Sequence, residues 1–322
     1  MIKTKRFSRI YIEISNQCNL QCSFCPVVER SKQIMTSHDF ETVLAQAAPL
    51  TEEVCLHLMG EPLSHPELEK IIEVCASHGA AINLTTNGTL LSEKTTALLL
   101  SPIVRQVNIS LQSFIDNFPG QSLDRYLIKV FEFVKIALKN RPDLYINLRL
   151  WNRSQAATSA DELTHDTLTQ TIFNAIADQL NVQVGPLNLN LRRKKSILIT
   201  GRLYLNFDTR FRWPNMADPM RSDFGFCHAL SHHIGIHADG TVVPCCLDKE
   251  AVLRLGNVFD EPLSQILSSK RAEAMLEGFK RGECVEELCK KCDFIQRFDR
   301  KTFNSAHGAR SEKTLAQGVS SG

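Results

Sequence analysis

The stretch RIYIEISNQCNLQCSFC, residues 9–25, decides how the chain folds. Its first seven residues alternate between apolar and polar side chains, which predicts a half-buried β-strand. Three cysteines, Cys18, Cys22 and Cys25, follow directly. A strand that runs into a loop of reactive side chains is typical of parallel α/β sheets, where functional residues gather at the carboxyl ends of the strands.

The same alternation of strand and helix continues through the first two thirds of the chain. Further strands rich in branched residues are predicted at 53–59, 80–87, 104–112 and 144–151. Helical patterns lie between and after them at 37–48, 65–78, 92–100, 122–140 and 163–180. Strands separated by such helices imply right-handed crossovers and a parallel sheet. With a sixth strand expected within 182–207, we predict an α/β fold built as a partial (β/α)6 barrel.

Each of the later predicted strands carries an unusual polar motif at or just after its carboxyl end. These motifs are Met59-Gly60-Glu61-Pro62, Thr85-Thr86-Asn87-Gly88, the pair Ser110 and Gln112, and the pair Arg149 and Trp151. Because the carboxyl ends of parallel strands meet on one rim, we expect these side chains to lie near the three cysteines.

Composition excludes several classes of protein. The chain has 322 residues, of which 22% are charged, and its net charge is only +2, so it is neither a disordered polyelectrolyte nor strongly attracted to nucleic acid. It has no apolar run near the ~18 residues that a membrane span needs. The N-terminus MIKTKRFSRI lacks the apolar stretch of a signal peptide, so we expect a cytoplasmic protein that does not enter a membrane.

The eleven cysteines point to metal binding, because reducing pools keep cytoplasmic thiols free of disulfides. Cys18, Cys22 and Cys25 are spaced so that three thiolates can hold one face of a metal cluster. A [4Fe–4S] cube held entirely by protein needs four cysteines, so this loop would leave one iron open. A zinc site is the alternative, although structural zinc usually completes four protein ligands.

A second cysteine group occupies the last third of the chain. Asp239-Gly240 predicts a tight hairpin turn that brings Cys245 back toward Cys227, and a helix then leads to the pair Cys289 and Cys292. These four thiolates would form a closed site, for which iron–sulfur and a zinc ribbon both remain open on spacing alone. The alternates for this site are Cys246 and Cys284.

The first triad, with Phe24 before its last cysteine, resembles the signature of the radical S-adenosylmethionine (radical SAM) enzymes. The resemblance covers roughly residues 8–295. It implies that SAM chelates the open iron and that an electron from an external flavodoxin or ferredoxin cleaves SAM to a 5′-deoxyadenosyl radical, which abstracts hydrogen from a substrate. Such chemistry belongs to the cofactors, while the protein supplies binding and orientation.

The resemblance also implies roles for the motifs on the rim. Gly60 and Glu61 are similar to the loop that meets the SAM ammonium, although Met59 stands where the first glycine of that loop often lies. Ser110, with Thr85 or Asn87, would meet the ribose hydroxyls. Arg149 would face the SAM carboxylate.

The C-terminal part resembles the SPASM/twitch extension of some radical SAM enzymes. Two auxiliary cubes would need eight thiolates, whereas six are present after residue 226, which favours the smaller form with one auxiliary cluster and two [4Fe–4S] clusters in all. The spacing also resembles that of a radical SAM dehydrogenase that acts on an aminocyclitol alcohol. We therefore expect four segments: a barrel at 1–207, a bridge at 208–224, an auxiliary domain at 225–298 and a flexible tail at 299–322.

Several functions follow from this resemblance. The first hypothesis is a radical oxidation in which the auxiliary cluster accepts an electron from a small-molecule substrate. The second is modification of a peptide side chain, for which we expect no leader-binding domain ahead of the first strand, since it begins near Ser8. RNA modification and an iron–sulfur electron carrier are further alternatives, and the basic run at 192–195 reads as a solvated loop. No general base can be assigned, and Asp116, Tyr126 and Asp208 are candidates by location alone.

Overall fold

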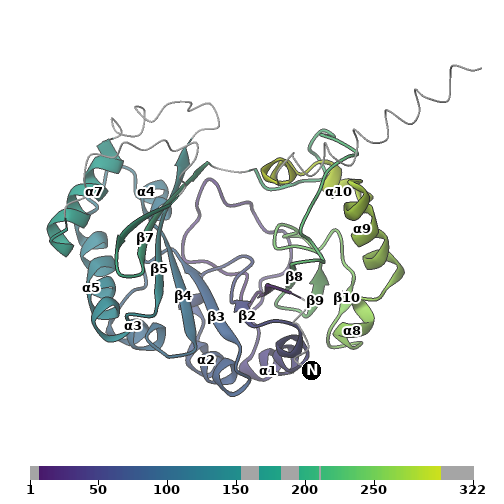
Figure 1. The fold of residues 1–322 in the computed structure, drawn as a ribbon, viewed down its shortest axis with the longest axis horizontal. Helices are drawn as coiled ribbons and strands as arrows, with labels where there is room; N and C mark the ends of the chain where they lie inside the picture. Colours follow the sequence, from purple (N-terminus) through teal and green to yellow (C-terminus); the bar gives the residue numbers. More distant parts are fainter. Residues whose placement is uncertain (1–6, 154–166, 183–195, 210–211, 299–322) are drawn as a thin grey trace, which may run out of the picture.

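A computed structural model describes residues 7–153, 167–182, 196–209 and 212–298 (Figure 1). The basic run at 192–195 and the predicted tail at 299–322 lie outside these residues.

A curved sheet forms the centre of the molecule (Figure 1). Within the described residues it has ten strands in the order β10-β9-β8-β1-β2-β3-β4-β5-β7-β6. Its barrel part comprises six parallel strands, β1 (Arg9–Ile12), β2 (Glu53–Cys55), β3 (Ala81–Thr86), β4 (Val104–Ser110), β5 (Tyr145–Arg153) and β7 (Leu203–Thr209). This arrangement confirms the predicted partial barrel. The sixth parallel strand is β7, and β6 (Ser196–Thr200) pairs antiparallel with it.

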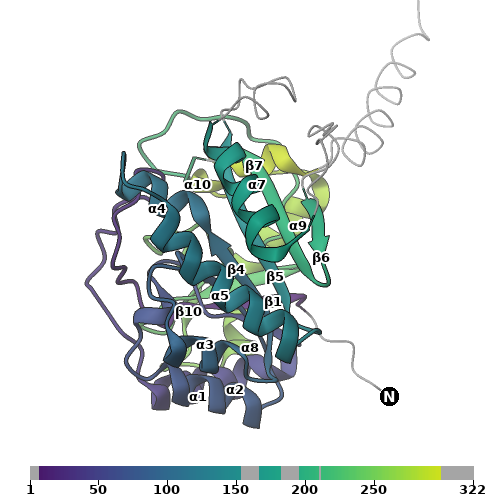
Figure 2. The same ribbon diagram turned by 90° about the vertical axis from the view of Figure 1, so that its left-hand side faces the viewer.

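Helices cover the outer face of this sheet (Figures 1 and 2). They are α1 (Ser37–Ala47), α2 (Leu68–Ser77), α3 (Glu93–Leu99), α5 (Asp124–Asn140) and α7 (Thr167–Leu180). The residues of β1 that face them, Ile10 and Ile12, are fully buried, whereas Arg9 and Tyr11 face the barrel interior and line its cavities. In the described ranges we find no helix that has both the length and the apolar character needed to cross a membrane.

Local signals explain most helix boundaries. Ser92 caps α3 in a capping box with Thr95, as its position in the sequence predicts. Gly79 follows α2 with a φ of +63°, a conformation that favours glycine at a helix end. Several strand ends were predicted too late. β1 ends at Ile12 and β2 at Cys55, and the fourth strand ends at Ser110, after which the residues form the short helix α4 (Leu111–Asn117).

The C-terminal part extends the same sheet. The predicted hairpin is present as β8 (His233–Ile236) and β9 (Thr241–Val243), with Gly240 at a φ of +80° in the turn. β8 pairs in parallel with β1 over its whole length, from Arg9 opposite His233 to Ile12 opposite Ile236. β10 (Gly256–Asn257) pairs with β9, and the helices α8 (Leu263–Ile266), α9 (Lys270–Arg281) and α10 (Glu287–Lys290) complete this part.

Candidate functional site

The first cavity lies at the carboxyl ends of the barrel strands and has a volume of about 360 Å³. It is lined by all but one of the residues predicted for the first cluster and for SAM: Cys18, Cys22, Cys25, Phe24, Gly60, Glu61, Thr85, Asn87 and Ser110. The exception is Arg149, which lines the neighbouring cavity. Side chains from four separate loops therefore meet here, as the strand ends predicted.

The end of α4 holds the cysteine loop in place. Both the backbone N–H and the hydroxyl of Ser23 donate to the Asp116 carboxylate. Asn117 accepts from the backbone N–H of Gln21 at 2.8 Å and donates to the Cys22 sulfur at 3.0 Å. Asp116, considered above as a base by location, is thus a positioning residue for the loop.

The pKa values and the exposure of the three thiols, Cys18, Cys22 and Cys25, suit metal binding. A hydrogen bond from the Cys25 thiol lowers the pKa of Cys22 to about 7, and the amide of Asn117 contributes to this shift. Burial raises the pKa of Cys18. Cys18 and Cys25 are exposed, so their sulfurs are accessible from the cavity. Three such thiols on one short loop fit a cluster that deprotonates its ligands on binding.

Gly60 makes a close backbone approach that no other residue could make. Its φ is +78°, and a Cβ there would lie 2.3 Å from the carbonyl oxygen of Ser15 and 2.8 Å from that of Gln17. The next residue, Glu61, accepts from the backbone N–H of Leu63 at 3.0 Å and from that of Asn87 at 2.7 Å. Burial raises the pKa of Glu61. The loops after β1, β2 and β3 are thereby joined around the cavity.

Asn87 extends this junction to the cysteine loop. Its side-chain amide donates to the side-chain oxygen Oδ1 of Asn19 at 2.9 Å, and its own backbone carbonyl accepts from the Tyr126 hydroxyl at 2.8 Å. Tyr126 is buried and stacks on Phe114 of α4. Tyr126, another candidate base, is therefore occupied in supporting the Asn87 loop.

A second cavity of about 350 Å³, the barrel cavity, lies inside the barrel and shares part of its lining with the first cavity, including His57, Thr85 and Ser110. Cys25 lines one part of it and Cys246, the neighbour of Cys245, lines another. Arg149 lines this cavity. Its guanidinium donates to the Thr85 hydroxyl at 3.4 Å and stacks over the ring of Trp151. Burial lowers the pKa of Arg149 to about 10. Asp208, the third candidate base, is not among the described residues that line this cavity.

A ladder of amides crosses the interior beneath this cavity. Asn147 donates to Asn108 at 2.9 Å, Asn108 donates to Asn83 at 2.8 Å, and Asn83 donates to Glu53 at 3.1 Å. These residues belong to four neighbouring strands, from β5 to β2. The ladder satisfies buried polar groups and gives the barrel interior a rigid polar floor.

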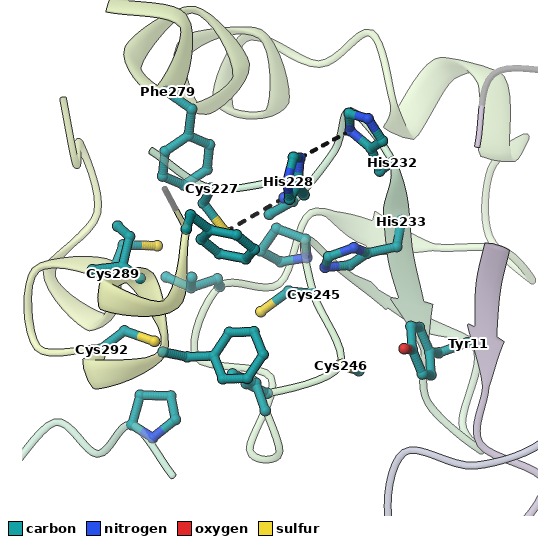
Figure 3. A pocket seen from close by; sticks show the side chains of 18 of the residues that line it. Tyr11, Cys227, His228, His232, His233, Cys245, Cys246, Phe279, Cys289 and Cys292 are labelled. Carbon is teal, nitrogen blue, oxygen red and sulfur yellow. Dashed lines mark hydrogen bonds between the residues drawn. The ribbon is translucent and has the colours of Figure 1, made fainter. Parts of the chain in front are cut away.

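The third cavity lies in the C-terminal part and has a volume of about 300 Å³. The four predicted ligands, Cys227, Cys245, Cys289 and Cys292, surround it (Figure 3). They come from the segment before β8, the loop after β9 and the region of α10. Cys246 also lines this cavity but lies toward Tyr11, whereas Cys284 is buried outside the lining.

The surroundings of these thiols suit a metal cluster. Burial raises the pKa of Cys227 to about 12 and the pKa values of Cys245 and Cys289 well above the usual range. Such thiols stay protonated until a metal displaces the proton. Within the described residues, no group of three or more His, Cys, Asp or Glu side chains is placed so that it could hold one metal ion.

An ionic clamp, which we define as Glu13, Arg30, Lys249 and Glu250, joins the two cysteine-bearing regions. Arg30 forms an ion pair with the fully buried Glu13 at 3.0 Å and donates to the backbone carbonyl of Lys249 at 2.5 Å. The ammonium of Lys249 donates to the Val27 carbonyl at 2.9 Å, and Glu250 accepts from the backbone N–H of Arg30 at 3.2 Å. The segment after Cys25 is therefore fastened to the segment after Cys246.

Sequence reasoning missed the clamp and several cavity residues. His57 and Cys246 line the barrel cavity without having been assigned to it. Trp213 also lines it and belongs to the segment 207–214, whose mixture of aromatic and charged residues predicts either a cavity floor or a seam between the two parts of the chain. His57 lies two residues beyond β2, and its position before Met59-Gly60-Glu61 could have placed it on the rim.

Comparison with known families matches both cysteine regions. The model of the radical SAM superfamily matches residues 12–149, and that of the SPASM iron–sulfur cluster-binding domain matches residues 227–293. A probable GTP 3′,8-cyclase from Aeropyrum pernix is 27% identical over 150 residues, which are 43% of this chain and 42% of that protein. The chain thus spans less than half the length of the curated relatives it matches.

Solved structures share the fold over most of the chain. BtrN in complex with AdoMet and 2-DOIA has a TM-score of 0.55 at 18% identity, covering 90% of this chain and 94% of that chain. SuiB of Streptococcus suis bound to the precursor peptide SuiA has a TM-score of 0.58 at 17% identity, covering 89% of this chain and 71% of that chain.

Proposed function

The chain is a radical SAM enzyme with a C-terminal SPASM domain, and from this we propose that it oxidises a small polar substrate with an auxiliary cluster as the electron acceptor. One observation carries the proposal: the barrel cavity is lined by Cys25 of the first cysteine group and also by Cys246, next to Cys245 of the second. A molecule in this cavity lies between the two cysteine groups.

The bound groups would supply the redox chemistry, namely abstraction of a hydrogen atom from a carbinol carbon through SAM and the first cluster, and acceptance of one electron by the auxiliary cluster when loss of the hydroxyl proton gives a carbonyl. We propose Cys18, Cys22 and Cys25 as ligands of the first cluster, and Cys227, Cys245, Cys289 and Cys292 as ligands of the second. Gly60, Glu61, Thr85, Asn87, Ser110 and Arg149 would bind SAM, with Phe24 packing beside it.

The chain's own residues contribute position and exclusion of water. The hydrogen bonds of Asp116 and Asn117 fix the cysteine loop, and Glu61 fixes the loops that face it. Trp213 lines both the first cavity and the barrel cavity, so it lies where the two cavities meet. A flavodoxin or ferredoxin in the cytoplasm would supply the electron.

Anaerobic reconstitution tests the proposal. We expect about eight irons per chain, since each cube holds four, and about four in the Cys18/Cys22/Cys25→Ala variant. Reduced wild-type protein should release 5′-deoxyadenosine from SAM, and the triple variant should not. Cys75→Ala is the matched control, because Cys75 is fully buried in the hydrophobic core. SAM cleavage by the triple variant would refute the ligand assignment.

Peptide modification is the second candidate, because SuiB bound to its precursor peptide shares the fold. The two functions differ in the product that one turnover forms. Substrate-dependent one-electron reduction of the auxiliary cluster, followed by electron paramagnetic resonance, supports oxidation of a small molecule. A new covalent bond in a co-purified peptide, detected by mass spectrometry, supports maturation instead.

A further inference from the structure

Two neighbouring residues at the end of α4 bring unlike groups to the loop of the first cysteine group. The side-chain amide of Asn117 donates to the Cys22 sulfur at 3.0 Å. The two carboxylate oxygens of Asp116 accept from the backbone N–H and the hydroxyl of Ser23, which lies between Cys22 and Cys25. The loop therefore meets a hydrogen-bond donor from one residue and a negative charge from the residue before it.

Backbone groups fix the orientation of the Asn117 amide. Its oxygen accepts from the backbone N–H of Gln21 at 2.8 Å, and that group can only donate. Its nitrogen donates to the backbone carbonyl of Ser113 at 2.8 Å, and that group can only accept. An amide turned by 180° would place donor against donor and acceptor against acceptor. The second N–H of Asn117 is therefore held toward the Cys22 sulfur.

The sulfur of Cys18 has different surroundings. The backbone N–H of Leu20 donates to it at 3.4 Å. The side-chain nitrogen of Asn87 lies 3.9 Å from the same sulfur and donates to Asn19 at 2.9 Å. Of these two side-chain amides, that of Asn117 makes the shorter contact with a sulfur of the group.

Donors and charges near the sulfurs act in opposite directions on an iron–sulfur cluster. An added electron makes the thiolate sulfurs more negative, so a hydrogen-bond donor stabilises the reduced form and raises the reduction potential, whereas a nearby negative charge lowers it. Resting on the ligands assigned in the function proposed above, we infer that Asn117 raises and Asp116 lowers the reduction potential of the first cluster. The balance between these adjacent residues then determines how strong a reductant the chain requires.

Reduction potentials can be measured without turnover. The full chain, reconstituted anaerobically with both clusters, is poised at a series of potentials, and electron paramagnetic resonance follows the reduced clusters. The part of the spectrum that changes when SAM is added belongs to the first cysteine group, because that group leaves one iron open. The other part is an internal control, since Asp116 and Asn117 are not among the described residues that line the C-terminal cavity.

We expect substitutions at the two positions to shift the SAM-sensitive potential in opposite directions. Asn117→Leu removes the donor and should disfavour one-electron reduction about 3- to 10-fold, where tenfold corresponds to about 59 mV. Asn117→Asp keeps an acceptor for the N–H of Gln21 and adds a charge, so it should lower the potential at least as far. Asp116→Asn removes the charge, keeps an oxygen for Ser23 and should raise the potential.

The matched control for the change of charge is Asp124→Asn. Asp124 is exposed at the start of α5 and accepts from the Ser122 hydroxyl at 2.6 Å, so water and salt screen its charge. This variant should change the reduction equilibrium by less than about twofold. Iron content near eight per chain verifies that each variant is loaded.

A purely structural role predicts a different result, because a loosened loop would shift the potential in the same direction in Asn117→Leu and Asp116→Asn. Shifts of the same sign, or no shift in either Asn117 variant, overturn the inference. If Asn117→Leu takes up little iron, Asn117→Asp supplies the test because it still binds the N–H of Gln21. Loss of iron from both Asn117 variants assigns this residue to holding the loop and also overturns the inference.

The same protein distinguishes this inference from the proposed function. Opposite shifts in a chain that releases no 5′-deoxyadenosine from SAM when reduced contradict the proposed function and leave the inference standing. A chain that cleaves SAM but keeps the same potential in all of these variants contradicts the inference alone.

Discussion

Single residues determine how closely the loops of the first cavity approach one another. Gly60 brings its backbone against the loop that precedes Cys18, and Glu61 then binds the backbone after β3 with its carboxylate. Two adjacent residues of β2's loop thus contact the loops on both sides. The motif Gly60-Glu61 was predicted to meet SAM, and this stays a prediction; its observed contacts join the loops around the first cavity.

Gly60→Ala should disrupt this junction. A left-handed φ costs a non-glycine residue about 1–2 kcal/mol, and the added Cβ also collides with two backbone oxygens, so we expect destabilisation of about 2 kcal/mol or more and weak SAM binding. Gly79→Ala is the matched control, because Gly79 also has positive φ but a Cβ there meets no atom within 4 Å. Urea unfolding and equilibrium dialysis with SAM measure both effects. Equal losses in the two variants would show that contact with Ser15 and Gln17 is irrelevant.

At the scale of elements, local patterns predicted the strands and helices but not the contacts that join distant loops. The alternation in residues 9–15 and the cap at Ser92 are local, so they could be recognised directly. The clamp between Arg30 and Lys249 joins residues more than two hundred positions apart, and no sequence pattern encodes such a pair. For the same reason the hydrogen bonds of Asp116 and Tyr126 could not be predicted, since position on a rim does not reveal hydrogen-bond partners.

Replacing Arg30 of the ionic clamp by alanine should strongly destabilise the fold. Its side chain is 13% exposed and pairs with Glu13, which is completely buried, so Arg30→Ala leaves a buried carboxylate without its partner. We expect a loss of about 3–5 kcal/mol in unfolding free energy. Lys70→Ala breaks an exposed pair with Glu67, which water already screens, and should leave the unfolding free energy nearly unchanged. Adding Glu13→Gln to Arg30→Met removes both charges and should recover much of the loss in urea unfolding, whereas no recovery would contradict the role of the ion pair.

Substitution of single cysteines distinguishes the proposed ligands of the auxiliary cluster from the alternates. Cys292 lines the third cavity, whereas Cys284 is 3% exposed and lies outside its lining. We expect Cys292→Ser to lower the iron content from about eight toward about four per chain and Cys284→Ser to leave it unchanged. Iron analysis and the visible spectrum of reconstituted protein measure this. If Cys284→Ser lost iron and Cys292→Ser did not, Cys284 would be the ligand in place of Cys292.

At the scale of the whole molecule, the two cysteine regions share one sheet. β8 pairs with β1, so the strand that leads to Cys18 lies beside the strand that leads toward Cys245. The sequence predicted a hairpin after Cys227 but not its pairing with the first strand, because strand partners far apart in the chain leave no local pattern. The shared sheet and the ionic clamp together fix the relative positions of the two groups.

This shared interior also makes the fold sensitive to acid. Burial lowers the pKa of His57 to about 3, and those of His233 and His237 to about 4. In the unfolded chain each histidine titrates near 6.5. Between these values the unfolded chain binds protons that the folded protein excludes, so the unfolding free energy is fully present above about pH 6.5 and falls as the pH drops, by about 1.4 kcal/mol per pH unit for each histidine. His233→Gln should make urea unfolding less dependent on pH between 4.5 and 6.5, and the exposed His78→Gln should not. A pH dependence unaltered by His233→Gln would mean that this histidine is protonated in the folded protein.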